Sequence, residues 1–302
     1  GQFYFESVDA TAAPGRFVDE HPGFPEAVET AARRAGSGVI GVDSYLPDEV
    51  LRRIAALPGV KDVVDATEWM YQVRAVKLPA EMDRLAVAAR LAEDGIGIAL
   101  DTAAPGITER EMSAAVAGAM VAGGAVPRFV VVTVGERSAL SDARPTDRKW
   151  EPGELLRFDV GCVYQGYWSD VGRTAVRGEP NRLQAHRYRA ILAGEEAQLH
   201  QVRPGLGADD LFRVAVEAVE AAGLRPYRRH HCGHAIGTEV YEQPIIAPGW
   251  ETDLKENMVL CLETPFYELG WGGMMVEDTV VVTAEGHRRL TTSDRSLCVI
   301  EP

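Results

Sequence analysis

Two stretches of this chain each place an acidic residue on both arms of a sequence that is typical of a β-hairpin. In residues 155–176, two runs of apolar and β-branched residues flank Gln165-Gly166, a dipeptide typical of a tight turn. Folding about that turn brings Asp159 and Asp170 roughly opposite each other. Two carboxylates at that spacing repel, so the pairing is stable only if an arginine, a buried proton or a metal ion lies between them.

Residues 257–283 repeat the arrangement, with Glu263 and Glu277 on two apolar strands around a glycine-rich turn. Between the hairpins, "HHCGHAIGTEVYEQPII" (230–246) supplies histidines. Four carboxylates on buried strand ends cannot remain as bare charges in a core. An oxygen-rich, nitrogen-poor ligand set suits two divalent cations, with Mn²⁺ as the first choice and Zn²⁺, Co²⁺ or Fe²⁺ as alternatives. Such a pair activates a bridging water and polarises a carbonyl.

A purely structural interpretation of these acids stays open at this stage. A single acid in a strand is usually solvated or ion-paired, and structural ion pairs resemble functional sites. Arg157 could neutralise Asp159, and Arg173 could neutralise Asp170. The coincidence of two acidic hairpins with a histidine-glycine segment favours a site, because nothing structural requires all three.

Composition narrows the class of protein. The chain of 302 residues is 46% hydrophobic and carries a formal net charge of −14, which argues against nucleic acid and anionic membranes as partners. No apolar run reaches a membrane-spanning length, and "GQFYFESVDA" at the start does not resemble a signal peptide. The four cysteines are widely spaced without a CxxC motif, which indicates reduced thiols in a cytoplasmic protein.

The order of predicted elements indicates a small first unit and a larger second one. Residues 1–75 read as a mixed α/β unit with a strand at 37–43, a helix at 46–57 and a strand at 60–66. This unit is small for a domain, so we expect it to be part of a larger one. Beyond it, helices are predicted at 78–101, 107–124, 181–202 and 207–222, each pair being followed by a hairpin. The second unit is therefore expected to be an α+β domain of two similar halves.

The stretch from about 74 to 298 resembles the pita-bread metallopeptidases, which include methionine aminopeptidase, Xaa-Pro aminopeptidase, prolidase and the metal-free creatinase. The resemblance starts at "RAVKLPAEM" (74–82). "GHAIG" (233–237) is similar to the family's "GHGIG", and "VEDTVVVT" (276–283) to its "EDT" strand. It implies a pita-bread catalytic domain over 76–302 behind an incomplete creatinase-like N-terminal domain over 1–75.

The same resemblance implies a five-residue ligand set for two metal ions, on Asp159, Asp170, His234, Glu263 and Glu277. Asp170 and Glu277 would bridge both ions, and Asp159 would bind one of them. His234 and Glu263 would bind the other, and Glu263 would also be the general acid/base that carries the proton of the water. Cys232 lies close to His234, but a carboxylate-rich set argues against a thiolate ligand there.

Three further positions bear on the substrate. The family's peptidases use two additional histidines against the substrate and the developing oxyanion, where this chain has Asp142 in "SDARPTDR" and Tyr241 in "YEQP". A tyrosine still donates a hydrogen bond to an oxyanion, whereas an ionised aspartate favours a cationic group. His230, four residues before His234, either lines the substrate pocket, as in some members, or is an ordinary histidine.

The predicted function is thus a dinuclear-metal hydrolase of the Xaa-Pro peptidase type that cleaves an amide C–N bond in a short peptide. One alternative is a hydrolase or lyase for a small cationic or zwitterionic molecule, similar to ectoine hydrolase or dimethylsulfoniopropionate lyase, because the same fold hosts such enzymes. Another is a metal-free binding module of this fold. The resemblance also implies a homodimer.

Overall fold

The computed structural model describes residues 29–30, 32–34, 36, 38–42 and 46–301. Ser37 and Asp43, at the ends of the first predicted strand, and the first ten residues, considered above as a signal peptide, lie outside this set. The chain divides into two compact units, Gly1–Val73 and Arg74–Pro302, a boundary two residues before the predicted one.

The first unit contains a strand, a helix and a strand in the predicted order. β1 (Gly38–Val42) and β2 (Val60–Asp65) pair in parallel, and α2 (Asp48–Ala55) connects them. The helix buries Val50 and Ile54 in a small apolar cluster. Two strands alone bury little surface, so this arrangement has the size of a fragment of an α/β layer rather than of a whole domain.

The second unit repeats one order of elements. α3 (Thr67–Ala75) spans the boundary between the units. The first half then contains α4 (Pro79–Asp101), α5 (Glu109–Ala122), β3 (Val126–Val134), η1 (Gly135–Ala139), β4 (Leu155–Tyr164), β5 (Tyr167–Trp168) and β6 (Val171–Arg177). The second half contains α6 (Arg182–Gln201), α7 (Ala208–Ala221), β7 (Gly233–Ala235), β8 (Glu242–Ile245), β9 (Val259–Glu263), β10 (Phe266–Glu268), β11 (Gly272–Met274), β12 (Glu277–Thr283), β13 (Gly286–Arg289) and β14 (Cys298–Ile300). Two helices followed by a hairpin recur, as the sequence predicts.

The main sheet places the two acidic hairpins side by side at its centre. Its strand order is β3-β4-β6-β12-β9-β7-β8. The two halves therefore meet between β6 and β12, with β4 and β3 of the first half on one side and β9, β7 and β8 of the second half on the other. Three further strands pair with members of this row: β5 with β4, β13 with β12, and β14 with β6. The pair of β14 and β6 is parallel. β10 and β11 form a separate antiparallel pair. The predicted acids are therefore carried by neighbouring central strands.

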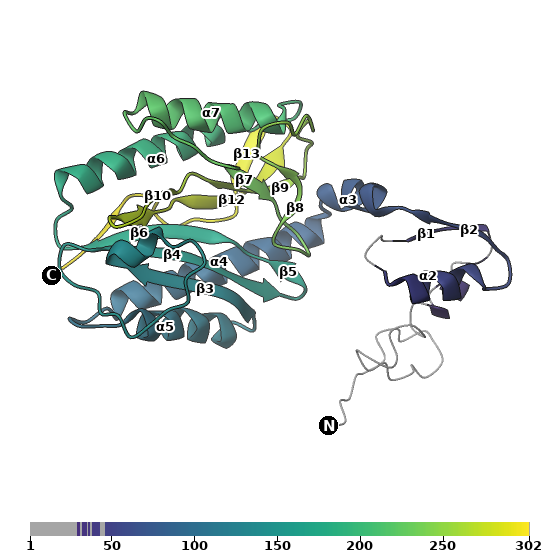
Figure 1. Cartoon of the computed structure of the whole chain (residues 1–302), viewed down its shortest axis with the longest axis horizontal. Helices are drawn as coiled ribbons and strands as arrows, with labels where there is room; N and C mark the ends of the chain where they lie inside the picture. The colour runs from purple at the N-terminus through teal and green to yellow at the C-terminus, as the bar shows by residue number, and fades with distance from the viewer. Residues whose placement is uncertain (1–28, 31, 35, 37, 43–45, 302) are drawn as a thin grey trace, which may run out of the picture. The chain divides into compact units, whose positions relative to one another are not determined.

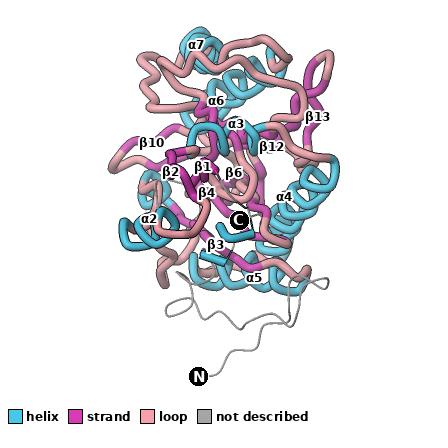
Figure 2. Tube along the Cα trace, turned by 90° about the vertical axis from the view of Figure 1, so that its right-hand side faces the viewer, coloured by secondary structure: helices cyan, strands magenta, loops and turns pink. Residues whose placement is uncertain are grey.

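Helix packing decides which strand residues face the site. α4 packs against α5 and α6 against α7, and Figures 1 and 2 show the sheet between the two helix pairs. In the first half, Ala92 and Met112 of the helices bury against Phe158 and Val160 of β4. Because successive side chains of a strand alternate, Asp159 points to the face of the sheet opposite these helices.

The helix ends follow their sequence signals, as α5 illustrates. The Thr108 hydroxyl accepts a hydrogen bond from the Glu111 backbone N–H, and the Glu111 carboxylate accepts one from the Thr108 backbone N–H. The spacing of the two residues, with a glutamate three positions after a threonine, is typical of this reciprocal capping box. The helix ends at Gly123-Gly124, where Gly124 has φ of 83°, a conformation that favours glycine.

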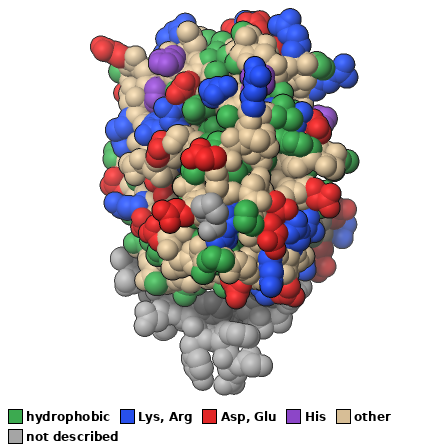
Figure 3. Space-filling model, turned by 90° about the vertical axis from the view of Figure 1, so that its left-hand side faces the viewer, with side chains coloured by type: hydrophobic (Ala, Val, Ile, Leu, Met, Phe, Trp, Pro, Cys, Tyr) green, Lys and Arg blue, Asp and Glu red, His purple; other side chains and the backbone are tan. Residues whose placement is uncertain are grey.

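Two observations on the described residues bear on membranes and nucleic acids as partners. No described helix is both long and apolar enough to cross a membrane. Figure 3 shows acidic and basic side chains interspersed on the face that it draws. The described residues on that face therefore do not form the continuous basic patch that nucleic-acid binding requires.

Candidate metal centre

The first acidic hairpin closes as predicted, but its two acids are offset. Gln165 and Gly166 both adopt positive φ, 48° and 87°, as a tight hairpin turn requires. Asp159 of β4 pairs with Gly172 of β6, so Asp170, directly before β6, is a diagonal rather than a directly opposite neighbour. Carboxylate oxygens of the two residues still lie within 4.8 Å of each other and of Glu277.

The second hairpin brings its acids directly together. Glu263 of β9 and Glu277 of β12 are register partners in the antiparallel pair. Both are buried, with relative exposures of 5% and 1%. Like charges directly opposite each other destabilise a sheet, so this pair calls for a positive group nearby.

The predicted histidine joins the two hairpins. His234 of β7 is fully buried, and its Nε2 lies 3.6 Å from Asp170 Oδ2. Its Nδ1 lies 3.0 Å from the Ala235 carbonyl oxygen, which can only accept a hydrogen bond, so Nδ1 carries the proton. Nε2 of the neutral ring is then left with a lone pair, the form in which histidine binds a metal.

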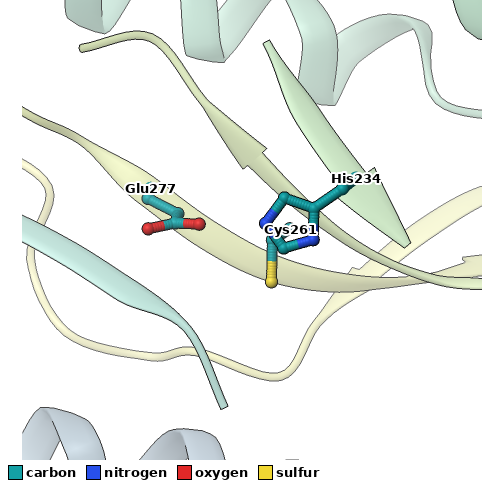
Figure 4. A group of neighbouring side chains, drawn as sticks. All are labelled: His234, Cys261 and Glu277. Carbon is teal, nitrogen blue, oxygen red and sulfur yellow. The ribbon is translucent and has the colours of Figure 1, made fainter. Parts of the chain in front are cut away.

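Two groups of potential ligand atoms share Glu277. One consists of Asp159, Asp170 and Glu277, and the other of His234, Cys261 and Glu277, which Figure 4 shows. In each group the candidate atoms lie within 4.8 Å of one another. Among the described residues, Asp170 Oδ1, His234 Nε2 and Glu277 Oε2 are buried without a hydrogen-bond partner. Buried polar atoms are normally paired, so these orphaned atoms fit a divalent cation as their missing partner.

The electrostatics of the protein alone agree with a missing cation. Burial and the charge of Asp170 raise the pKa of Asp159 to about 7, although Arg157 opposes the shift. Burial raises the pKa of Asp170, and burial with the charges of Asp170 and Glu263 raises that of Glu277 well above its ordinary value. Without a cation, these carboxylates therefore favour protonation.

The two arginines proposed as neutralising partners behave differently. Arg157 is fully buried, and its NH1 donates to Asp159 Oδ2 at 3.0 Å. Arg173 does not take Asp170 as a partner; its NH2 donates to Asp278 Oδ1 at 2.7 Å on the helix side of the sheet. Arg173 NH1 also donates to the Gly172 and Glu277 carbonyl oxygens. One acid is thus partly neutralised, while the remaining carboxylates are not.

His231, rather than His230, is the second histidine at this centre. His231 Nε2 lies 2.8 Å from Glu263 Oε1, whereas the side chain of His230 is exposed. Burial favours the protonated form of Glu263, but the hydrogen bond and charge of His231 outweigh it and lower the pKa of Glu263. The sequence did not single out His231, because a run of two adjacent histidines does not indicate which ring turns inward.

Tyr241 faces the centre, as the sequence predicts. Its ring stacks on that of His234 with centroids 3.9 Å apart and planes inclined by 23°, and 48% of the residue is exposed. The hydroxyl lies 3.4 Å from His231 Nε2. Burial, followed by the charge of Glu263, raises the pKa of Tyr241, so the hydroxyl keeps its proton and can donate it in a hydrogen bond.

An ion-pair network anchors the strand next to Tyr241. Glu242 is buried, and its carboxylate accepts from Lys77 Nζ at 2.8 Å and from Arg74 NH2 at 2.6 Å. Both basic residues belong to the "RAVKLPAEM" motif, which thus serves to fix the position of β8. Buried charges of this kind are tolerated only as pairs, so the network restrains where Tyr241 lies.

Asp142 lies at the edge of the site rather than within it. It is exposed and accepts a hydrogen bond from the Ser141 hydroxyl at 3.2 Å. The Ser141 carbonyl oxygen accepts from Arg157 NH2 at 2.7 Å, and Arg157 contacts Asp159. Asp142 therefore directly follows Ser141, the loop residue that Arg157 connects to Asp159.

The cysteine that borders the centre is Cys261, not Cys232. All four cysteines are free thiols, and Cys232 is buried in the apolar cluster beneath α6 and α7. Cys261 pairs with His234 across β9 and β7 and belongs to the second group of potential ligands. This proximity depends on how β7 pairs with β9, which local sequence patterns do not reveal.

Comparison with known proteins agrees with the geometry. A model of metallopeptidase family M24 matches residues 83–284. The Xaa-Pro dipeptidase of Pyrococcus horikoshii is 32% identical over 260 residues, 85% of this chain and 74% of that protein. The structure of the prolidase from Pyrococcus furiosus has 30% identity and a TM-score of 0.80 over 90% of this chain and 80% of its own. The structure of the X-Pro aminopeptidase from Thermotoga maritima has 27% identity and a TM-score of 0.84, over 93% of this chain and 81% of its own.

The fold and the site define a metallohydrolase with the pita-bread fold, an α+β fold around a curled antiparallel sheet. The chain belongs to metallopeptidase family M24. The predictions of the fold and of a hydrolase of the metallopeptidase type are therefore confirmed. Members of this family typically bind a dinuclear metal centre, and the five predicted ligands all lie within the matched residues.

Proposed function

We propose that the protein is a dinuclear-metal hydrolase that cleaves the C–N bond of short peptides of the Xaa-Pro type. The observation that carries the proposal is the convergence of Asp159, Asp170, His234 and Glu277, with Glu263 as the cross-strand partner of Glu277. Three of these residues, Asp170, His234 and Glu277, have buried atoms that lack a hydrogen-bond partner among the described residues. Two relatives that are 32% identical to this chain are Xaa-Pro dipeptidases, which supports a short peptide as the class of substrate.

In this proposal the five residues hold two divalent cations. These residues would be Asp159, Asp170 and Glu277 on one side of the centre and His234, Glu263 and the shared Glu277 on the other. When bound, the two ions activate a water molecule and polarise the carbonyl of the substrate. Mn²⁺ is the first choice of ion, because most of the donor atoms are carboxylate oxygens.

The chain's own residues then handle the proton and the oxygen. Glu263 takes the proton of the attacking water and passes it to the leaving nitrogen. His231, 2.8 Å away, orients the Glu263 carboxylate and keeps it ionised. Tyr241 donates its hydroxyl hydrogen to the oxygen of the reacting carbonyl, a contact that is typically worth about 10²-fold to 10³-fold in rate.

The alternative substrate class rests on one specific observation. Tyr241 lies over His234, where the family's peptidases use a histidine, and Asp142 adds a negative charge at the edge of the site. These two features favour a small cationic or zwitterionic molecule as the substrate, as in enzymes similar to ectoine hydrolase or dimethylsulfoniopropionate lyase. The metal-free binding module is the weaker alternative, because all five ligand residues are present.

The function is tested by comparing substrate classes with one enzyme preparation. We would assay Xaa-Pro dipeptides beside cyclic amidines, guanidino compounds and betaine-like molecules, with Mn²⁺ added. The proposal expects Mn²⁺-dependent dipeptide cleavage that Glu263→Gln lowers by at least about 10²-fold. Glu285→Gln, at an exposed glutamate in the β12–β13 turn, is the control and should keep full activity. Activity that is confined to the non-peptide compounds would support the alternative.

We also propose a homodimer that works in the cytoplasm. The four free cysteines, three of them buried, suit a reducing compartment. The dimer follows from the resemblance to dimeric relatives. Light scattering of the purified protein tests it, and a monomeric mass at working concentrations would reject it.

A further inference from the structure

The two groups of potential ligands that share Glu277 differ in their chemistry. The first, with Asp159 and Asp170, offers only oxygen atoms. The second, with His234 and Cys261, offers nitrogen, sulfur and oxygen. Hard cations prefer oxygen ligands, whereas thiolate and imidazole favour Zn²⁺ and Co²⁺. The two halves of the centre therefore do not suit the same ion equally well.

Cys261 belongs to a buried apolar cluster and also borders the centre. It lies on the same face of β9 as Glu263, two residues away, and directly across from His234. Its Sγ is buried and lies 3.5 Å from Thr279 Oγ1 and 3.8 Å from the Asp170 carbonyl oxygen. Figure 4 shows the side chains of His234, Cys261 and Glu277 gathered at one place.

A second observation points to a ligand at the same place. His234 Nε2 and Glu277 Oε2 have no hydrogen-bond partner among the described residues, and both side chains are almost completely buried. Cys162 is likewise buried in an apolar cluster, where its Sγ lies 3.5 Å from the Ala88 carbonyl oxygen and 3.4 Å from the Ser169 hydroxyl, but it belongs to neither group of potential ligands. A buried thiol beside two orphaned donor atoms is thus particular to Cys261.

We propose that Cys261 Sγ binds the cation on the His234 side, so that this position selects Zn²⁺ or Co²⁺ while the all-oxygen position takes Mn²⁺. The inference rests on the proposed dinuclear centre and makes it chemically asymmetric. On binding, the S–H bond breaks, a sulfur–metal bond forms, and the proton passes to solvent, so no oxidant or reductant is needed.

Titration of the metal-free protein with Co²⁺ alone tests the proposal, because a thiolate ligand produces a sulfur-to-cobalt charge-transfer band in the near ultraviolet. The wild-type protein is expected to develop this band as the first equivalent of Co²⁺ binds. Cys261→Ser should lose the band and bind Zn²⁺ at least about tenfold more weakly, with Mn²⁺ affinity nearly unchanged. Cys232→Ser is the matched control, since it removes a buried thiol two residues from His234 and should keep the band.

The outcomes separate this inference from the function on which it rests. Co²⁺ binding to the wild type without the band, or a band that persists in Cys261→Ser, would overturn the role of Cys261 while leaving the dinuclear centre intact. Because the first of these results needs no variant, poor folding of Cys261→Ser would not decide the matter. A calorimetric titration that detects no binding of Co²⁺, Zn²⁺ or Mn²⁺ would instead overturn the proposed centre itself.

Discussion

Glu263 and Glu277 are cross-strand partners in register, one on β9 and the other on β12, and both are buried. A pair of like charges in this position costs up to about 1 kcal/mol even on an exposed sheet, and more where water is excluded. The fold nevertheless builds the pair into the middle of its largest sheet. His231 contacts Glu263, whereas Glu277 Oε2 has no hydrogen-bond partner among the described residues, so Glu277 is the member of the pair that fits a cation as its partner.

His230 and His231 provide a matched pair for testing which histidine serves the site. His231→Ala removes the 2.8 Å contact to Glu263 Oε1, so we expect kcat/KM to fall by at least about tenfold. The pKa of Glu263 should rise at the same time, since His231 lowers it, and the acidic limb of the rate profile should move to higher pH. His230→Ala, at an exposed side chain, should leave both unchanged. The reverse pattern would restore His230 as the functional histidine.

Tyr241→Phe separates the hydroxyl from the ring. The phenyl ring can keep the stacking on His234, whereas the donor to the substrate oxygen is lost, so we expect kcat to fall by about 10²-fold with little change in Tm. Tyr164→Phe, at a hydroxyl that contacts Gln165 in the hairpin turn, should have no effect on activity. Equal activity of Tyr241→Phe and the wild type would remove Tyr241 from the mechanism.

Replacing the two divergent positions tests the substrate class. Tyr241→His combined with Asp142→His gives this chain the histidines of the family's peptidases. If the divergence sets specificity, the double variant should gain Xaa-Pro cleavage and lose activity on the native substrate by about tenfold or more. If wild-type protein already cleaves Xaa-Pro dipeptides at ordinary enzyme rates, and the double variant changes nothing, the two positions do not determine the substrate.

Stability should respond to pH in opposite ways with and without metal. In the metal-free protein the pKa of Asp159 is raised from 3.8 to about 7, so this group adds stability at low pH and loses it as the pH rises through about 7. Bound cations require ionised carboxylates, so protons compete with them as the pH falls. We therefore expect the increase in Tm caused by Mn²⁺, relative to a chelator, to shrink between about pH 8 and pH 5. An increase that is constant over this range would contradict the prediction.

Arg173 should matter for the joint between the two halves of the domain. β6 and β12 share a single backbone register pair, Gly172 with Glu277, and Arg173 donates to both carbonyl oxygens and to buried Asp278. Arg173→Met should lower the free energy of unfolding by about 3 kcal/mol, because it leaves buried polar groups without their partner. Arg110→Met, at an exposed pair with Asp147, should cost less than about 1 kcal/mol. Urea titrations that give equal losses would reject this role.

Local sequence patterns were sufficient for the hairpins and for most of the proposed ligand set. Alternation fixed the face on which Asp159 lies, and the turn dipeptide Gln165-Gly166 fixed where its hairpin closes. The offset between Asp159 and Asp170 was missed, although one continuous register runs from the turn into β6. Tyr164 pairs with Tyr167 across the turn, and the same register pairs Asp159 with Gly172. Counting outward from Gln165-Gly166 is therefore enough to place Asp170 two residues away from the position opposite Asp159.

The contacts that reach across the sheet could not be predicted in the same way. Cys261 lies beside His234 only because β7 pairs with β9, and the intervening sequence does not specify that pairing. Likewise, His231 turns towards Glu263 in a loop whose backbone follows tertiary packing rather than a local preference. Arg173 was considered as a possible partner of Asp170, but it lies on the helix side of β6 and donates to Asp278 instead.

Metal content is the most direct test of the proposed centre, because Glu277 belongs to both groups of potential ligands. Wild-type protein, Glu277→Gln and the exposed control Glu285→Gln would be reconstituted with Mn²⁺ and Zn²⁺ together, passed through a desalting column and analysed for both metals. The account predicts two ions per chain in the wild type and the control, and the loss of at least one ion in Glu277→Gln. A wild-type protein that retains no metal, or a Glu277→Gln protein that retains two ions as firmly as the control, would contradict it.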